Sequence, residues 1–200
     1  MKAGFIAGFA VMLLTTSVLA DVRETEEFTY DVNAGARLSL ENINGSIEII
    51  GGSGDQVEIV AHKKAGKQEY LDELLVVIDA DPDYIRIETR HPDSKGGWFK
   101  WGNDSSGSVS YEVKIPSDLN LDAIETVNGD VDIKQAGGKV MASTVNGSLT
   151  VSGLSSDVDL ETVNGSVRAE FDALGSGQRV NAEAVNGKIS LVLPADASAR

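Results

Sequence analysis

An apolar residue followed by Asn-Gly occurs five times in this chain of 200 residues. The last four copies stand 18, 18 and 22 residues apart, which is the spacing of a structural repeat with one supersecondary unit in each copy. Asn-Gly is also a turn signal, because glycine adopts a positive φ readily and asparagine tolerates one. The sequence therefore predicts an array of similar units. The motif residues are Asn44, Gly45, Asn128, Gly129, Asn146, Gly147, Asn164, Gly165, Asn186 and Gly187.

The motif fits either of two geometries. In a two-residue hairpin, Val163 would pair with Ser166, and a branched apolar residue would stay exposed before every turn. In a wound solenoid the motif forms a corner, and Val163 points inward. Because this position is Ile or Val in all five copies, we favour the second geometry. We therefore predict inward-facing Val145, Val163 and Val185 in an all-β, single-stranded β-solenoid.

Stacked corners would place equivalent residues about 4.8 Å apart, the spacing of paired strands. We expect the asparagine side chains to hydrogen-bond from coil to coil as a structural corner ladder, with glycine supplying a positive φ. A row of asparagines that binds a ligand is the alternative use of the same column. Asp122 is a misfit, because it occupies the place that Val140, Val158 and Val180 hold in later copies.

Residues 1–20 have the pattern of a signal peptide. Lys2 precedes an apolar run from Phe5 to Leu14, and a small-x-small pattern ends at Ala20, after which we expect cleavage. About ten apolar residues are too few to cross a bilayer as a helix, and no later stretch is apolar enough. We expect an exported mature chain in the periplasm or at the cell surface, with no membrane-spanning segment.

Residues 21–200 are expected to form one β-solenoid repeat domain. Alternating apolar and polar residues predict strands, and the charged segment near 67–74 is the one expected helix. A Gly- and Ser-rich stretch predicts a surface loop over 91–108, and regular Asn-Gly coils are expected over 121–200.

The end of the sequence resembles the entry to its own repeats. Leu193–Ala199 echoes Ile115–Leu121, which precedes the first regular coil, but Arg200 stands where the next motif should follow. Either the sequence is truncated or the last rung is open. An open rung would allow self-association through the C-terminal edge.

Composition argues against several classes of function. The chain has 31 acidic and 17 basic residues and a net charge of -14, which disfavours nucleic acid and anionic lipid as partners. It has no cysteine and two histidines without metal-ligand spacing, so we expect no disulfide, no lipid anchor on cysteine and no zinc site. No Gly-x-Ser-x-Gly elbow, Walker loop or dinucleotide fingerprint occurs. We predict no catalytic residue, no cofactor and no metal.

An aromatic cluster is the first candidate contact site. Trp98, Phe99 and Trp101 stand together in the Gly- and Ser-rich stretch, with Lys95 and Lys100 nearby. Aromatic side chains on a loop can stack on sugars or enter a membrane interface. The alternative is that they cover one open end of the coil array.

A column of acids is the second candidate site. Glu41, Glu125, Glu161 and Glu183 each stand two residues before the Ile or Val of the motif, and Ser143 interrupts the column. Stacked carboxylates repel one another by on the order of 1 kcal/mol per pair, which a bound cation would relieve. A solvated acidic stripe is the alternative.

The run from Val109 to Pro116, followed by Leu121 to Gly129 and repeated Thr-Val-Asn-Gly coils, resembles a family of exported bacterial β-strand-repeat proteins. Its members are named putative adhesins, and their common domain has no established function. The resemblance covers residues from about Val32 to the end of the chain. It implies a β-solenoid at or near the cell envelope, and it carries over no catalytic residue.

We therefore expect a non-enzymatic exported module with a structural or adhesion-like role and an unknown envelope or surface partner. Two other classes stay open. One is a polysaccharide-active β-helix enzyme that would use acids on one face. The other is a periplasmic protein that binds a cation or a small ligand. An enzyme needs a concave cluster of acids, whereas a scaffold needs only flat repeated faces.

Overall fold

The computed structural model describes residues 21–92 and 107–195. Most strands in these ranges alternate buried and exposed side chains, as the sequence pattern predicts. The strands are β1 (Val22–Asp31), β2 (Arg37–Glu41), β3 (Ile47–Gly52), β4 (Gln56–Ala65), β5 (Leu75–Asp81), β6 (Tyr84–Arg90), β7 (Gly107–Pro116), β8 (Asn120–Asn128), β9 (Val131–Lys134), β10 (Val140–Asn146), β11 (Leu149–Leu154), β12 (Val158–Asn164), β13 (Val167–Phe171), β14 (Val180–Asn186) and β15 (Ile189–Val192). The helix α1 (Gln68–Glu73) lies within the predicted 67–74 segment.

Three predicted features lie outside the described residues. They are the signal peptide at 1–20, the aromatic cluster of Trp98, Phe99 and Trp101, and the last residues up to Arg200. Of the predicted surface loop over 91–108, residues 93–106 also lie outside, and Gly107 and Ser108 belong to β7 instead. No helix within residues 21–92 and 107–195 is long and apolar enough to cross a membrane.

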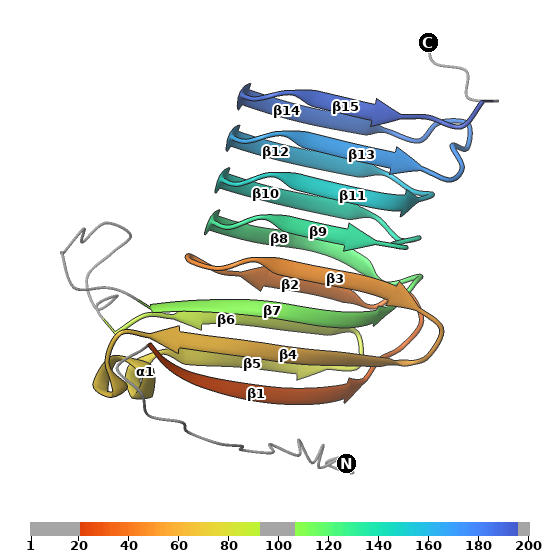
Figure 1. The fold of residues 1–200 in the computed structure, drawn as a ribbon. Coiled ribbons are helices and arrows are strands. Elements are labelled where there is room, and N and C mark those ends of the chain that lie inside the picture. Colours follow the sequence, from red (N-terminus) through yellow and green to blue (C-terminus); the bar gives the residue numbers. More distant parts are fainter. Residues whose placement is uncertain (1–20, 93–106, 196–200) are drawn as a thin grey trace.

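The strands of the described ranges form two large sheets that face each other (Figure 1). One sheet has eight strands in the order β1-β4-β7-β3-β9-β11-β13-β15. The other has seven, in the order β14-β12-β10-β8-β2-β6-β5. Side chains from the inner faces of both sheets form a single hydrophobic core.

The predicted single-stranded β-solenoid is wrong, although the chain is all-β. The two sheets are mixed: β1 with β4, β4 with β7, and β5 with β6 pair antiparallel, whereas the remaining neighbours pair parallel. The reason lies in the N-terminal half. There the chain turns back on itself between β5 and β6, and β4 lies between β1 and β7, so no continuous winding forms.

The Asn-Gly segments are corners between the two sheets and are not two-stranded hairpins. Strand β8 belongs to the seven-stranded sheet and β9, after Asn128-Gly129, to the eight-stranded sheet, so the two do not pair with each other. The same holds for β2 and β3, β10 and β11, β12 and β13, and β14 and β15. We call each of these five sets of two consecutive strands, together with its corner, a coil. Coils stack in parallel register, with Val140 opposite Val158 and Leu149 opposite Val167.

The prediction that the valine of the motif points inward is also wrong. Val145 and Val163 are each 40% exposed and Val185 is 74% exposed. The threonine before the valine is the buried residue, since Thr144 and Thr162 are only 3% exposed. A buried hydroxyl needs a hydrogen-bond partner. Each of these threonines has one in the carbonyl oxygen of a glycine one coil earlier.

Asp122 is accommodated by an irregularity in β8. Leu121 lies opposite Val140, and Ile124 lies opposite Ala142, so β8 has one more residue than β10 over this stretch. A bulge of this kind leaves the extra residue unpaired and lets it turn outward. The carboxylate of Asp122 accepts a hydrogen bond from Arg37 at 3.4 Å.

Candidate functional site

The asparagines of the motif form a continuous row of hydrogen bonds along the corners. Each side-chain Nδ2 donates to Oδ1 of an asparagine one coil earlier. The pairs are Asn128 to Asn44 at 2.8 Å, Asn146 to Asn128 at 2.9 Å, Asn164 to Asn146 at 2.9 Å and Asn186 to Asn164 at 3.0 Å. Both polar atoms of an interior amide thus bond to neighbouring coils, which aligns the amides and fixes the register of the stack.

The glycines of the motif are required by close approach of backbone to backbone. A Cβ on Gly147 would overlap the carbonyl oxygen of Gly129, and Gly129, Gly165 and Gly187 have the same relation to the motif glycine before them. Only Gly45 among the motif glycines has a positive φ, of 125°. The expectation of a positive φ at the other four is wrong, because the stacking distance and not the turn excludes a side chain there.

An exposed apolar column lies beside the asparagine row. It consists of Ile43, Val127, Val145, Val163 and Val185, and we call it the valine column. Val127 is half-buried and the other four are exposed. Four of these branched apolar side chains thus face solvent at equivalent positions of the corners.

The predicted acidic stripe is held in register on the seven-stranded sheet. Glu41 lies opposite Glu125, and Glu161 lies opposite Glu183, whereas Ser143 separates the two pairs. Arg86 donates to Glu41 at 3.1 Å, so one member already has a cationic partner. Among the described residues, no three His, Cys, Asp or Glu side chains gather as metal ligands would. Cation binding by the stripe stays a prediction.

A buried ion-pair group joins β4 to β1, the edge strand of the eight-stranded sheet. Lys63 points into the core from β4 with its side chain only 4% exposed, and its Nζ donates to Glu24 at 3.0 Å and Glu26 at 2.9 Å. Burial acts to lower the pKa of Lys63, but the hydrogen bonds and charges of Glu26 and Glu24 outweigh burial and raise it. Inward charges on and beside an edge strand discourage pairing with another chain.

The sequence pattern predicted neither this ion-pair group nor strand β1, which carries Glu24 and Glu26. The inward face of β1 presents Glu24 and Glu26 before Phe28 and Tyr30, so the apolar alternation that marks a strand is hidden. A usable signal existed in β4, where Val57, Ile59, Ala61 and Ala65 share the parity of Lys63.

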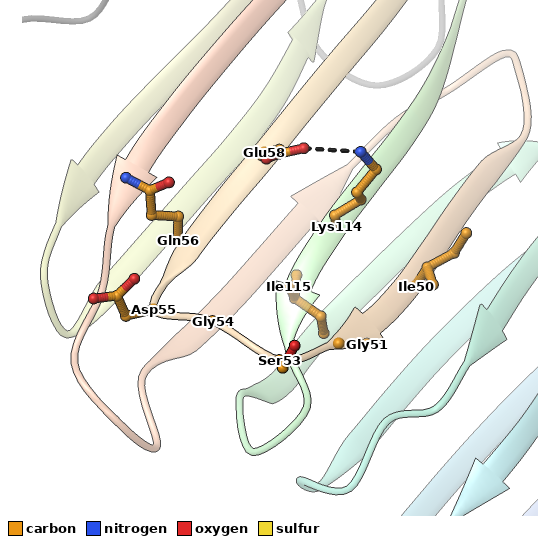
Figure 2. A pocket seen from close by; sticks show the side chains of 10 residues that line it. Ile50, Gly51, Ser53, Gly54, Asp55, Gln56, Glu58, Lys114 and Ile115 are labelled. Carbon is orange, nitrogen blue, oxygen red and sulfur yellow. Dashed lines mark hydrogen bonds and ion pairs between the residues drawn. The ribbon is translucent and has the colours of Figure 1, made fainter.

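A shallow hollow lies at the turn between β3 and β4, with a volume of about 210 Å³. Ile50, Lys114, Glu58 and the segment 51–56 line it, as Figure 2 shows. Three charged residues line the hollow. Nζ of Lys114 donates to Glu58 at 2.9 Å, so these two are paired with each other, and Asp55 is the third. Ligand pockets are commonly larger, at about 300 to 1,000 Å³, and more enclosed. The hollow gives little support to a small-ligand site.

The two ends of the sheets differ. At one end α1 packs against β1 and β4. At the other end lies the coil of β14 and β15, which we call the open coil (Figure 1). Ile189 and Leu191 of this coil lie opposite Val167 and Ala169 of the coil before it. Val167 and Ala169 face the core and are 0% exposed, whereas Ile189 and Leu191 are 42% and 43% exposed. Among the described residues, no strand pairs with the outer edges of β14 and β15, so the open coil presents strand edges and apolar side chains together.

Comparison with solved structures gives a fold relationship. The chain is similar to a putative cell adhesion protein from Clostridium sporogenes, with a TM-score of 0.55 and 12% identity over 85% of this chain and 100% of that chain. It is less similar to putative adhesins from Bacteroides fragilis (TM-score 0.30, 12% identity, 84% and 97% coverage) and Parabacteroides merdae (TM-score 0.25, 10% identity, 85% and 96% coverage). No protein-family model and no curated protein matches the chain. At this identity the first likeness shows a shared fold.

Proposed function

We propose that the chain is a non-enzymatic, exported module that acts at the periplasmic or outer surface of the cell envelope in a structural or adhesion-like role. The observation that carries the proposal is the exposed valine column on a rigid, regularly stacked frame. Repeated flat faces suit contact with an extended partner, whereas an enzyme requires convergent reactive groups. The fold shared with a protein named for cell adhesion supports the same proposal.

Self-association through the open coil is part of this proposal. Edge strands with free backbone groups pair readily with another strand, and the open coil adds exposed Ile189 and Leu191 to such edges. Charge does not oppose pairing there. Arg179, Glu183 and Lys188 are the charged residues of segment 179–193, although the chain as a whole carries -14. A second copy that meets the same end by a two-fold axis would cover these side chains.

Cell fractionation with crosslinking tests the proposed location and role. In the organism that encodes the chain, we expect a mature form that lacks residues 1–20, in the periplasmic or surface fraction, crosslinked to an envelope component. A full-length chain retained in the cytoplasm would contradict the proposal. Hydrolysis of envelope polysaccharides by the purified chain would support the enzyme alternative, and a calcium- or magnesium-dependent rise in the melting temperature would support the cation-binding alternative.

A further inference from the structure

The five Asn-Gly pairs share a reactivity that goes beyond corner formation. The backbone nitrogen of a glycine can attack Cγ of a preceding asparagine, because glycine has no Cβ to hinder the approach. The attack requires that the glycine N–H can lose its proton and that the asparagine side chain can rotate toward it. The sequence offers this chemistry equally at all five pairs, but the structure does not.

Four pairs are held by the coil that follows them. Their glycine N–H groups donate to asparagine carbonyl oxygens of the next coil, from Gly45 to Asn128 at 3.0 Å, Gly129 to Asn146 at 3.1 Å, Gly147 to Asn164 at 3.0 Å and Gly165 to Asn186 at 3.1 Å. The Oδ1 atoms of the same four asparagines accept from the next asparagine of the row. Attack at these pairs therefore needs local opening of the stack first.

The fifth pair, Asn186-Gly187, lies in the open coil. Among the described residues, nothing accepts from the Gly187 N–H and nothing donates to Oδ1 of Asn186. Both residues are exposed, whereas Gly45, Gly129, Gly147 and Gly165 are half-buried. One hydrogen bond, to Oδ1 of Asn164, holds the Asn186 side chain.

The open coil also lacks the threonine-to-glycine hydrogen bond that earlier coils make. Thr162 donates its hydroxyl to the Gly147 carbonyl oxygen at 2.9 Å, but the residue opposite Thr162 in β14 is Ala184. Alanine has no hydroxyl, so no such bond forms between Ala184 and Gly165. The corner at Asn186 is therefore bonded to its neighbour more weakly than the corners before it.

We propose that Asn186 is a site of spontaneous intramolecular deamidation and that the four earlier motif asparagines are protected by the stack. The Gly187 nitrogen loses its proton and bonds to Cγ of Asn186, which closes a succinimide ring. The bond from Cγ to Nδ2 breaks with its electron pair on nitrogen, and the amide takes up a proton and leaves as ammonia. Water then opens the ring at either carbonyl to give aspartate or isoaspartate, with no oxidation or reduction.

The modification alters the open coil. A carboxylate at position 186 cannot donate to Oδ1 of Asn164, so two oxygens would face each other where a hydrogen bond stands at 3.0 Å. Isoaspartate adds a backbone carbon at the corner between β14 and β15. The change also adds a negative charge to the open coil. Each effect weakens this end as a surface for strand pairing.

Peptide mapping by mass spectrometry tests the proposal on the folded mature chain, kept dilute in mildly alkaline buffer. We expect Asn186 to convert at least about tenfold faster than Asn164, since the interior pair must open before it reacts. In denaturant all five asparagines are expected to convert at similar rates, because each is followed by glycine. Equal rates at Asn186 and Asn164 in the folded chain would overturn the proposal.

A variant provides the matched control. Asn186→Ser should abolish the conversion in its peptide and leave the other four asparagines as slow as before. Conversion at Asn164 should stay slow, because the Gly165 N–H still donates to the backbone carbonyl of residue 186. An unchanged rate of total ammonia release would overturn it. None of these outcomes depends on adhesion or on an envelope partner.

Discussion

Thr144 donates its side-chain hydroxyl to the carbonyl oxygen of Gly129, one coil earlier, at 3.0 Å. Thr144 is 3% exposed, so its hydroxyl has no easy access to water as a substitute partner. The same bond joins Thr162 to Gly147 at 2.9 Å and Thr126 to Gly45 at 3.3 Å. The threonine of Thr-Val-Asn-Gly is thus an internal clamp between coils.

Replacing Thr144 with valine keeps the shape of the side chain and removes the clamp. We expect Thr144→Val to lower the free energy of unfolding by about 1 kcal/mol, because the Gly129 carbonyl loses a buried partner. Urea unfolding measures the change. The control is Thr150→Val, at an exposed position, which should alter stability by less than about 0.5 kcal/mol. Equal effects at the two positions would contradict the clamp.

Substitution of a motif glycine should lower the free energy of unfolding by more than the Thr144→Val change does. Gly147→Ala places a Cβ against the Gly129 carbonyl oxygen, and the backbone of two coils must shift to make room. We expect a loss of about 2 to 4 kcal/mol, as for other overpacked sites. Gly52→Ala is the matched control, because a Cβ there meets no atom within 4 Å. Thermal unfolding that ranks the two variants equally would show that close approach is not the reason for glycine.

The residues at the corner show how far the sequence could predict this fold. Strand-rich repeats and the spacing of the coils followed from the Asn-Gly pattern. The inward face did not, because Thr144 and Val145 are both acceptable in strands, and only the Gly129 carbonyl, a tertiary partner, decides which one is buried. Apolar character alone favoured the valine.

The N-terminal half was harder to predict for a related reason. Antiparallel pairing of β1 with β4 depends on a contact between residues far apart in sequence, such as Glu26 and Lys63. A charged residue on an inward face looks like a solvent-facing one until its partner is known.

The stability of the fold should depend strongly on the ion pairs of Lys63 with Glu24 and Glu26. Lys63→Met leaves Glu24 and Glu26 facing each other at a half-buried site, and we expect a loss of about 3 kcal/mol in the free energy of unfolding. Adding Glu24→Gln and Glu26→Gln should restore most of it, because no unpaired charge then remains. Denaturant unfolding of the single and triple variants measures this coupling. Additive losses would show that the three side chains do not act as a group.

Alkaline pH should destabilise the fold through Lys63 and Tyr111. Burial raises the pKa of the Tyr111 phenol above its ordinary 10.0, and the pKa of Lys63 is also raised. In both cases the folded state keeps a proton that the unfolded chain releases, so stability is complete below the ordinary values and falls as pH rises past them. Thermal unfolding from neutral pH to about pH 11 measures the loss.

The variant Tyr111→Phe distinguishes the contribution of Tyr111 to the alkaline loss of stability from that of Lys63. The variant loses the hydrogen bond to Thr89, which is 2.7 Å long, so we expect lower stability at neutral pH. Its further loss at alkaline pH should be smaller than that of the unchanged chain, because the phenol no longer titrates. A loss of the same size in both proteins would assign the alkaline effect to other groups.

The open coil predicts concentration-dependent association. In sedimentation velocity, the mature chain should shift to a dimer as concentration rises, because Ile189 and Leu191 and two strand edges become covered. Leu191→Glu should remain a monomer, since pairing would bury an unpartnered carboxylate. Val145→Glu is the matched control, with similar exposure of 40% against 43% but a position in the valine column away from this end. If the unchanged chain stays monomeric at high concentration, or if both variants abolish the dimer, the open coil is not the pairing surface.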